Sequence, residues 1–426
     1  MPLKVIIIGT GLVGAALAIA LKKAGHEPTL YDKFDLAGAA VTAQANSEPL
    51  IFQFGDTGGH VMIQSNGLRV LKSLGVLDEI RRLGLSSGSA ETSYMDGSGA
   101  ARANLFGVKE DEDVKVPVQI LRSMLHSILV RECHRAGVKT FTGKRLVQVQ
   151  ATETRVTAVF DDGTTAVGDL LVGADGIHSA TRRLLFGEDV AARFSGLVGF
   201  IGTVDLGVHN IKLHHPTTFH IDRVKRREVV VFKVAEDKAA WRVTEYADPD
   251  PEATDNWRPY SNLPKNAERL AGLTESWGLP AEFVACIRNS NRITPVSMYD
   301  LPNVASYHKG RTLLVGDAAH GMLPNFGSGL SVGLEDVGTL YELFTQFSEG
   351  EVFKILDAYN AIRVPRAHGI ANRSRGIAST VYADSQFGAS VNHFKMRIFY
   401  YLLNHGFVPH PNEYDHARAV KSFLAK

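Results

Sequence analysis

The N-terminal residues contain an apolar strand, a glycine-rich turn and a helix, and this order constrains the fold more than any other part of the chain. Val5 to Ile8 is a β-branched run of the kind found in buried parallel strands. Gly9, Gly11 and Gly14 follow, and an Ala- and Leu-rich segment then runs to Gly25. In a βαβ unit such glycines allow a tight turn, a close approach of the backbone to a pyrophosphate, and close packing of helix on strand. The stretch therefore predicts a dinucleotide-binding α/β fold.

The segment after this helix completes the nucleotide-binding unit. A second strand is predicted at Pro28 to Tyr31, and Asp32 at its end lies where an acidic side chain can bind a ribose hydroxyl. The helix begins at Leu12 and Val13, where free backbone N–H groups are expected to point at phosphate groups. We assign these residues, with Lys33 beside Asp32, to the same site.

Residues 5 to 21 also have the apolar character of a signal peptide or a short membrane anchor, with Ala18-Ile19-Ala20 as a possible cleavage site. The spacing of the glycines and the Lys22-Lys23 pair directly after the run favour the nucleotide-binding interpretation. No later segment has the roughly 18 uninterrupted apolar residues that a spanning helix needs. We therefore expect a cytoplasmic protein without a transmembrane segment.

Composition excludes several classes of function. The chain has 46 basic and 45 acidic residues and no basic stripe, which argues against a nucleic-acid partner. The two cysteines, Cys133 and Cys286, are far apart, which fits a reducing compartment and excludes a C-x-x-C redox centre. His214-His215 has no partners at zinc spacing, so we expect no metal site.

The length of 426 residues favours two intertwined domains. Strands and helices alternate to about residue 185, whereas residues 195 to 300 contain alternating runs typical of an antiparallel sheet. We expect a first part of the dinucleotide-binding domain at 1–185, which can include substrate-side strands, and an antiparallel substrate domain at 186–300. The dinucleotide-binding domain is expected to return at 301–345, and a helical region to follow at 346–426. Residues 34 to 57 are predicted to form a long loop.

Two further motifs turn the dinucleotide prediction into a flavin prediction. One apolar strand ends in Asp175 and Gly176, and another ends in Gly316 and Asp317. Ligands bind at such carboxyl ends of strands, and an Asp there can accept hydrogen bonds from sugar-type hydroxyls. The glycines at 327 and 329 open another helix, whose N-terminus can face a phosphate or an electron-rich ring edge.

With these three motifs in this order, the chain resembles the group A flavoprotein monooxygenases, typified by para-hydroxybenzoate hydroxylase and salicylate hydroxylase. The resemblance covers nearly the whole chain and includes Arg122 and the late segment 363–366. It implies a Rossmann-type FAD-binding domain of the para-hydroxybenzoate hydroxylase type, an antiparallel-sheet substrate domain and C-terminal helices. The FAD-binding residues implied by the motifs and this resemblance are Gly9, Gly11, Leu12, Val13, Gly14, Asp32, Lys33, Arg122, Val147, Asp175, Gly176, Gly316, Asp317, Pro324, Gly327, Gly329 and Leu330.

The resemblance also implies the reaction. FAD is expected to bind non-covalently, and NADPH or NADH is expected to reduce it as a transient co-substrate without a second nicotinamide-binding domain. O₂ then gives a flavin C4a-hydroperoxide, which hydroxylates or epoxidises a small-molecule substrate. The protein is expected to be a monomer or a homodimer.

The substrate sheet departs from some relatives of this family. Several fungal members carry an Arg and a Tyr at places that correspond by motif to Ile201 and Phe232. The resemblance therefore implies a pocket without that polar anchor and a fairly apolar aromatic, indole-like or alkene substrate. His60 and His220 are the candidate catalytic histidines, although an ordinary partly exposed histidine is the simpler explanation of each. The aromatic group 399–401 is expected to lie on a helix packed against the core.

Three other functions of an FAD-binding protein compete with this interpretation. A halogenase of this fold would carry a Trp-x-Trp motif, which Trp241, Trp257 and Trp277 do not form. A flavin-dependent reductase of isoprenoid double bonds shares the fold, but Arg122 and the Pro324 segment favour the hydroxylases. A non-catalytic FAD-binding protein would predict damage in the flavin-facing segment, and residues 316–329 carry none.

Overall fold

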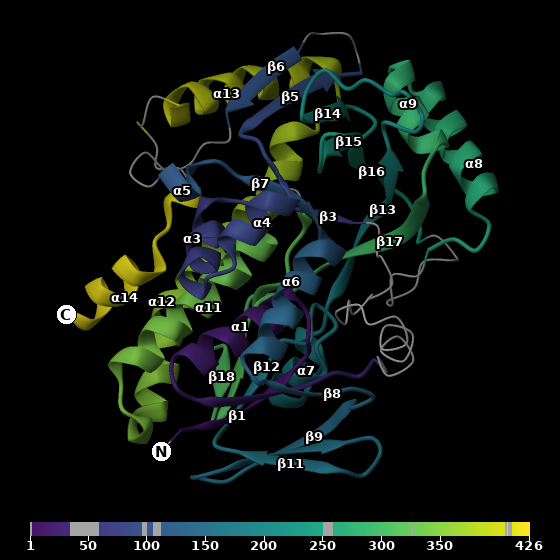
Figure 1. The fold of residues 1–426 in the computed structure, drawn as a ribbon. Helices are drawn as coiled ribbons and strands as arrows, with labels where there is room; N and C mark the ends of the chain where they lie inside the picture. The colour runs from purple at the N-terminus through teal and green to yellow at the C-terminus, as the bar shows by residue number, and fades with distance from the viewer. Residues whose placement is uncertain are drawn as a thin grey trace.

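The computed structural model describes residues 2–34, 59–95, 100–104, 112–249, 259–324, 327–404, 407 and 411–426 (Figure 1). The long loop expected at residues 34–57 lies outside this range except for its first residue. The chain forms a nucleotide-binding layer, a large substrate-side sheet and a set of C-terminal helices, in agreement with the expected fold class.

A six-stranded sheet forms the centre of the nucleotide-binding half, with the strand order β18-β19-β12-β1-β2-β8. Its strands are β1 (Lys4–Ile8), β2 (Glu27–Tyr31), β8 (Lys139–Phe141), β12 (Leu170–Gly173), β18 (His308–Lys309) and β19 (Thr312–Leu314). β1 pairs in parallel with both β2 and β12 and is buried from Val5 onward, which explains its β-branched sequence. The three motif-bearing strands β1, β12 and β19 are therefore neighbours, and their carboxyl ends lie at one edge of the sheet.

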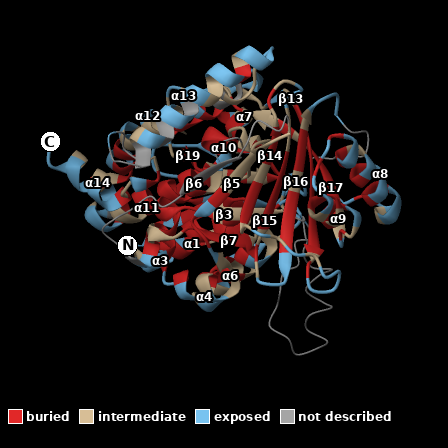
Figure 2. Cartoon of the chain, turned by 90° about the horizontal axis from the view of Figure 1, so that it is seen from above, coloured by how far each residue is buried: buried red, intermediate tan, exposed pale blue. Residues whose placement is uncertain are grey.

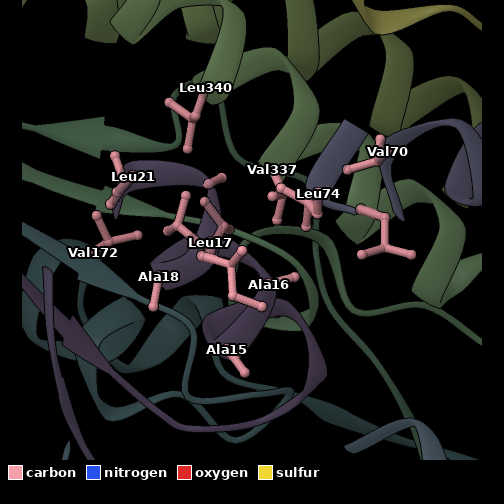
Figure 3. Close-up of a cluster of buried hydrophobic side chains, with 14 of the residues drawn as sticks. Ala15, Ala16, Leu17, Ala18, Leu21, Val70, Leu74, Val172, Val337 and Leu340 are labelled. Atoms are coloured by element: carbon pink, nitrogen blue, oxygen red, sulfur yellow. The ribbon is translucent and has the colours of Figure 1, made fainter. Parts of the chain in front are cut away.

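Helix α1 (Leu12–Lys23) packs between this sheet and two other helices. Its small and aliphatic residues from Ala15 to Leu21 are almost completely buried, because α11 (Gly329–Gln346) and α6 (Arg122–Arg135) both lie against it. Figure 3 shows Leu17 and Leu21 of α1 in the same core as Val337 and Leu340 of α11. The alanines of α1 allow this close approach of helices. The helix α3 (Ser65–Leu74) completes the cluster and ends at Gly75, which has a φ of +82°.

The second large sheet has seven strands in the order β17-β13-β16-β15-β14-β5-β6. They are β5 (Ser89–Tyr94), β6 (Ala100–Asn104), β13 (Arg193–Asp205), β14 (Thr217–Asp222), β15 (Arg227–Lys233), β16 (Lys238–Tyr246) and β17 (Arg292–Asp300). All neighbouring pairs are antiparallel except β14 with β5, which is parallel. Most of the sheet comes from the region where an antiparallel sheet is expected, and β5 and β6 join it from the N-terminal part of the chain.

Helices α8 (Leu263–Ser276) and α9 (Ala281–Arg288) cover one face of this sheet (Figure 2). The sequence interpretation of residues 195–300 as strands misses both helices. Local signals for α8 are present: the Asn262 side chain caps its N-terminus by accepting a hydrogen bond from the Lys265 N–H, and Leu270 and Ala271 face the core. The buried face of these helices explains why every second residue of the strands beneath them is apolar.

The remaining elements connect these layers. One small sheet contains β9 (Leu146–Ala151), β10 (Val156–Phe160) and β11 (Thr165–Gly168). Another contains β3 (His60–Ile63), β4 (Leu85–Ser86) and β7 (Val118–Leu121). The other helices are α4 (Leu77–Leu83), α5 (Glu112–Lys115), α7 (Ala180–Phe186), α10 (Asp317–His320), α12 (Val352–Val381), α13 (Gln386–Asn404) and α14 (His416–Leu424). Among the described residues, no helix combines the length and the apolar character needed to cross a bilayer.

Candidate functional site

The glycine turn after β1 has the geometry that the three glycines predict. Gly9 has a φ of +104°, and a Cβ there would lie 2.5 Å from the carbonyl oxygen of Ala174. A Cβ on Gly14 would overlap the carbonyl oxygen of Gly9, so helix α1 could not approach the strand. A Cβ on Gly11, by contrast, would meet no heavy atom within 4 Å. The α1 N-terminus therefore faces open space at Gly11, where its backbone N–H groups are suited to bind a phosphate.

Asp32 lies beside this turn and is held there by hydrogen bonds. One carboxylate oxygen accepts from the backbone N–H of Thr10 at 2.8 Å and from its hydroxyl at 2.7 Å, and the other accepts from the Phe34 N–H at 3.0 Å. A carboxylate has about four acceptor positions, so Asp32 retains capacity for a ribose hydroxyl. The Nζ of Lys33 lies 5.2 Å from the centre of the Phe34 ring, and the side chain of Val147 on β9 is exposed.

Asp175 has a clear structural task. Its carboxylate accepts hydrogen bonds from the Ser179 hydroxyl at 2.5 Å and from the Thr181 N–H at 3.0 Å, so it orders the start of α7. Burial raises the pKa of Asp175, while these hydrogen bonds act in the opposite direction. Next to it, Gly176 has a φ of +77° and open space at its missing Cβ. The buried Arg182 of α7 donates to the carbonyl oxygen of Ala319 at 2.7 Å and so joins this motif to α10.

The third motif brings an acid and a cation from distant parts of the chain together. Asp317 is the first residue of α10 and is exposed at the edge of the nucleotide-binding sheet. Burial lowers the pKa of Arg122 at the start of α6, while the negative charge of Asp317 opposes this shift. A cationic guanidinium and a carboxylate thus lie near each other at one end of the sheet, as a ligand with phosphate and hydroxyl groups requires.

A buried network of charges supports the same loop from behind. Asp336 accepts hydrogen bonds from the Gly316 N–H at 2.8 Å and from Nε of Arg363 at 2.7 Å, and its carboxylate lies 2.7 Å from Nε2 of His320. Arg363 also binds the neighbouring Glu335 at 2.7 Å, and the side chains of Arg363, Glu335 and Asp336 are fully buried. Burial alone would raise the pKa of Asp336, but His320 and Arg363 lower it to about 2.

Glu335 and Asp336 do not belong to the motifs from which the site is predicted. Their signal in the sequence is weak: two adjacent acids inside an otherwise apolar helical segment, with Arg363 and Arg366 about thirty residues later. Each must be paired because an isolated buried charge is costly. The network ties α11 and α12 to the loop at Gly316.

The segment at the start of α11 is described only in part, since residues 325 and 326 lie outside the described range. Gly327 has a φ of +60°, and a Cβ there would lie 3.8 Å from the Met62 side chain. Gly329 begins α11, with no heavy atom within 4 Å of its missing Cβ, and Leu330 follows it. Pro324 lies at the other side of the gap. The open backbone at Gly329 resembles that at Gly11.

One face of the seven-stranded sheet turns toward this segment, and we call it the inner face. Paired residues of antiparallel strands share a face, so the pairs Ile201–Arg242 and Arg242–Val230 place Ile201 and Arg242 together on it. Phe232, two residues after Val230, lies on the same face. An apolar cluster covers its β17 end and consists of Leu197, Ile201, Val296 and Met298, with Leu323 packed against them. A Cβ on Gly59 would lie 3.5 Å from the Ile201 side chain, and the Gly59 carbonyl accepts a hydrogen bond from the Arg122 N–H at 2.9 Å, which connects the two halves of the site.

The inner face contains a charged pair that the sequence interpretation misses. Arg242 on β16 lies directly opposite Ile201, and its Nη2 is 2.7 Å from a carboxylate oxygen of Glu228 on β15. Both side chains are largely buried. The expectation of a pocket without a polar anchor is therefore incomplete: an arginine is present one strand away, and Glu228 neutralises it. The alternation of residues along β16 separates Arg242 from Trp241 and Val243, but it does not identify the neighbouring strand or the face of the sheet.

The two candidate histidines lie on opposite sides of this sheet. The ring of His60 lies against that of Phe232, with 3.5 Å between their centres, so His60 is on the inner face. Burial, together with the charge of Arg242, lowers the pKa of His60 to about 3, which keeps it neutral. His220 is on the other face and packs against Phe283 of α9, with ring centres 4.3 Å apart. We therefore do not propose His220 as a catalytic residue.

A cavity of about 380 Å³ opens at the far end of the same sheet. Its walls include Leu121, which pairs with His60, and Thr203 and Arg292 of the inner face. Other wall residues, Val204, Ala239 and Ile293, belong to the core under α8 and α9. The volume is in the range of small-molecule pockets. No group of His, Cys, Asp and Glu residues in the described parts of the chain is arranged to hold a metal ion.

Comparisons with known proteins agree with this geometry. Residues 2–374 match the family model described as the FAD binding domain. The chain is 27% identical over 401 residues to the chloroplastic zeaxanthin epoxidase of Oryza sativa subsp. japonica, a match that covers 89% of this chain but 56% of that protein. It is 29% identical over 395 residues to salicylate hydroxylase of Pseudomonas putida, covering 86% of this chain and 83% of the relative. The solved structure of Klebsiella pneumoniae HpxO complexed with FAD and uric acid has a TM-score of 0.71 at 19% identity, covering 99% of this chain and 96% of the other.

Proposed function

Because the chain belongs to the FAD binding domain family, as one of the group A FAD-dependent monooxygenases, we propose that it uses NADPH or NADH with O₂ to oxygenate a small, fairly apolar molecule. The substrate class is an aromatic, indole-like or alkene compound, and the reaction is hydroxylation or epoxidation. The observation that carries this proposal is the apolar inner face of the sheet, beside the Gly316 loop. The charge of Arg242 on this face is neutralised by Glu228.

The residues at the carboxyl ends of β1, β12 and β19 fit FAD. The open α1 N-terminus at Gly11 would bind the pyrophosphate, Asp32 the ribose of the ADP half, and Arg122 and Asp317 the phosphate and ribityl region. When bound, FAD supplies the hydride acceptance and the oxygen activation. The network of Asp336 and Arg363 holds the Gly316 loop in position for this cofactor.

The inner face would orient the substrate and exclude water. Ile201, Val296 and Met298 offer an apolar surface to a ring or alkene, and their contact with Leu323 closes the side toward the Gly316 loop. Neutral His60 can exchange a hydrogen bond with a substrate hydroxyl, but its low pKa makes it a weak base. No residue is therefore assigned as a strong general base, which suits an electron-rich substrate.

The Arg242–Glu228 pair is proposed to select against free carboxylates. An arginine without its acid would attract an anionic substrate, whereas the paired arginine offers only its remaining N–H donors to a neutral hydroxyl or carbonyl group. Both cysteines are buried free thiols, and on this basis we place the activity in the cytoplasm.

The test is aerobic oxidation of NADPH and NADH by the purified flavoprotein against neutral phenols, indoles, alkenes and their carboxylated analogues. Hydrogen peroxide is measured alongside. Oxidation stimulated by a neutral substrate, with oxygen incorporated into the product, supports the proposal. Bound FAD that neither nicotinamide reduces would refute a monooxygenase, and a preference for carboxylated substrates would refute the proposed substrate class.

A further inference from the structure

Helix α13 (Gln386–Asn404) carries a stripe of large apolar side chains that the described parts of the molecule leave open. The exposed fractions are 80% for Phe387, 37% for Val391, 64% for Phe394, 46% for Ile398 and 58% for Tyr401. Their spacing alternates between four and three residues, which places all five on one side of a helix. The aromatic group at 399–401 lies on a helix, as expected, but Tyr401 is exposed and does not pack on the core. The side chains of 399 and 400 lie outside the described residues.

The opposite side of α13 attaches the helix to the body of the protein. Ala389 is fully buried, and its carbonyl oxygen accepts a hydrogen bond from Nη1 of Arg223 at 3.1 Å. The His393 ring lies 3.1 Å from the Tyr94 hydroxyl at the end of β5. Figure 1 accordingly shows α13 lying across β5 and β6 at the edge of the molecule, and Figure 2 shows exposed residues along it. The stripe is thus held outward by specific contacts.

The charges carried by α13 itself have one sign, and Asp384, two residues before the helix, pairs with Arg226. Lys395 and Arg397 are both exposed, and at about 100° per residue they lie roughly 80° to either side of the middle of the stripe. The sequence contains no Asp or Glu from residue 385 to residue 412. Aromatic and aliphatic residues flanked by cations, without acids, form the pattern of helices that lie in a membrane interface.

We propose that α13 docks along its length on a lipid surface that contains anionic headgroups. The apolar stripe would enter the boundary between headgroups and acyl chains, while Lys395 and Arg397 extend sideways to the phosphates. Exposed Phe407, shortly after the helix, would add to the same contact. The surface lies outside the catalytic site, so this proposal does not depend on the proposed reaction.

A second copy of the chain would fit the apolar stripe of α13 less well than a lipid surface. An antiparallel pair of α13 helices, related by a two-fold axis near Phe394, would bring Lys395 and Arg397 near their own copies. In a parallel pair, the same cations would occupy the flanking positions that normally carry complementary charges. The helix has no acidic residue to pair with them in either arrangement.

The experiment is co-sedimentation of the full-length flavoprotein with vesicles of phosphatidylcholine alone or mixed with phosphatidylglycerol. We expect binding to the mixed vesicles that weakens with added salt. The double variant F394E/I398E should bind at least about tenfold more weakly. The double variant K395Q/R397Q should lose about tenfold or more on the mixed vesicles only, together with the salt dependence.

The control variant Val208→Glu adds a negative charge at an exposed apolar residue far from α13 in the sequence and should bind like the parent chain. FAD content and melting temperature show that each variant is folded. Absence of binding to the mixed vesicles, or equal binding by F394E/I398E and the parent chain, would overturn the proposal. A lipid-free dimer that I398E dissociates would also overturn it, since a second copy would then cover the stripe.

Discussion

The nucleotide-binding half and the seven-stranded sheet build their sites in different ways. Around Gly9, Gly11 and Gly14 the site is made of backbone, and the three glycines that shape it lie within a few positions of one another in the chain. On the inner face of the sheet, the neighbours Ile201 and Arg242 are joined only by strand register across about forty residues of chain. A site made of local backbone geometry can be recognised as a motif, whereas a site made of cross-strand neighbours cannot.

The largest difference in stability is expected between substitutions of two glycines in the same turn. Gly14→Ala places a Cβ on the Gly9 carbonyl oxygen, so we expect either no soluble protein or a loss of about 3 kcal/mol or more in the free energy of unfolding. Gly11→Ala adds a methyl group in open space and should cost about 1 kcal/mol or less in the apoprotein, while weakening FAD binding. Denaturant unfolding of the apoprotein and FAD titration measure the two effects. Equal destabilisation by both substitutions would contradict the assigned roles.

The buried charge network should give the next largest effect. Arg363→Met leaves Glu335 and Asp336 buried with fewer partners, and we expect a loss of about 3–5 kcal/mol in unfolding free energy. Arg288→Met breaks an ion pair with Glu268 on the protein surface and should change stability by less than about 1 kcal/mol. If both variants lose the same unfolding free energy, the network does not support the Gly316 loop as described.

Acidification should destabilise the covered face of the sheet through His220. Burial lowers its pKa to about 4 in the folded protein, below the ordinary value of 6.5, so the unfolded chain binds the proton more tightly. The stability due to neutral His220 is complete above pH 6.5 and is lost as the pH falls from 6.5 toward 4. From about pH 7.5 to about pH 5, the free energy of unfolding should decrease by about 2 kcal/mol because of this residue. Urea unfolding of the parent chain and His220→Phe at both pH values should show a smaller decrease in the variant; an equal decrease would refute this assignment.

The smallest effect is expected on the inner face. Glu228→Gln leaves the charge of Arg242 unbalanced, so KM for a carboxylated aromatic substrate should fall about fivefold, equivalent to about 1 kcal/mol. KM for the neutral analogue should stay nearly constant. Arg227→Gln, next to Glu228 on β15, removes a cation that pairs with Asp222 instead and serves as the control. A similar fall in KM for the neutral analogue would show that the pair does not discriminate charge.

The sequence predicts the nucleotide-binding half well because its signals are local. β1, α1 and β2 lie close to their expected positions, and the stop at Gly75 follows from a single left-handed residue. In the substrate half, an antiparallel sheet within residues 195–300 is correctly expected, but the partners and the faces of its strands are not. A shift of one residue in register reverses the face of every side chain, so neither Arg242 nor His220 could be placed from the pattern alone.

Other failures have separate physical causes. The helices α8 and α9 lie in the chain between two strands of one sheet, so the expectation of an antiparallel sheet over residues 195–300 spans them without distinguishing them. Glu335 and Asp336 are polar residues in the core, which a hydrophobic pattern does not predict. The exposed stripe of α13 has the periodicity of a buried helix, and only the tertiary structure shows that the described residues leave it uncovered.

The two cysteines give the chain a practical property. Cys133 and Cys286 are both buried, and burial raises the pKa of each thiol to about 12, so neither carries an appreciable thiolate at neutral pH. Maleimide reagents require an accessible thiolate. A cysteine introduced at an exposed position would therefore react far faster than the native two, and a fluorophore or spin label could be attached there while both native cysteines remain in place.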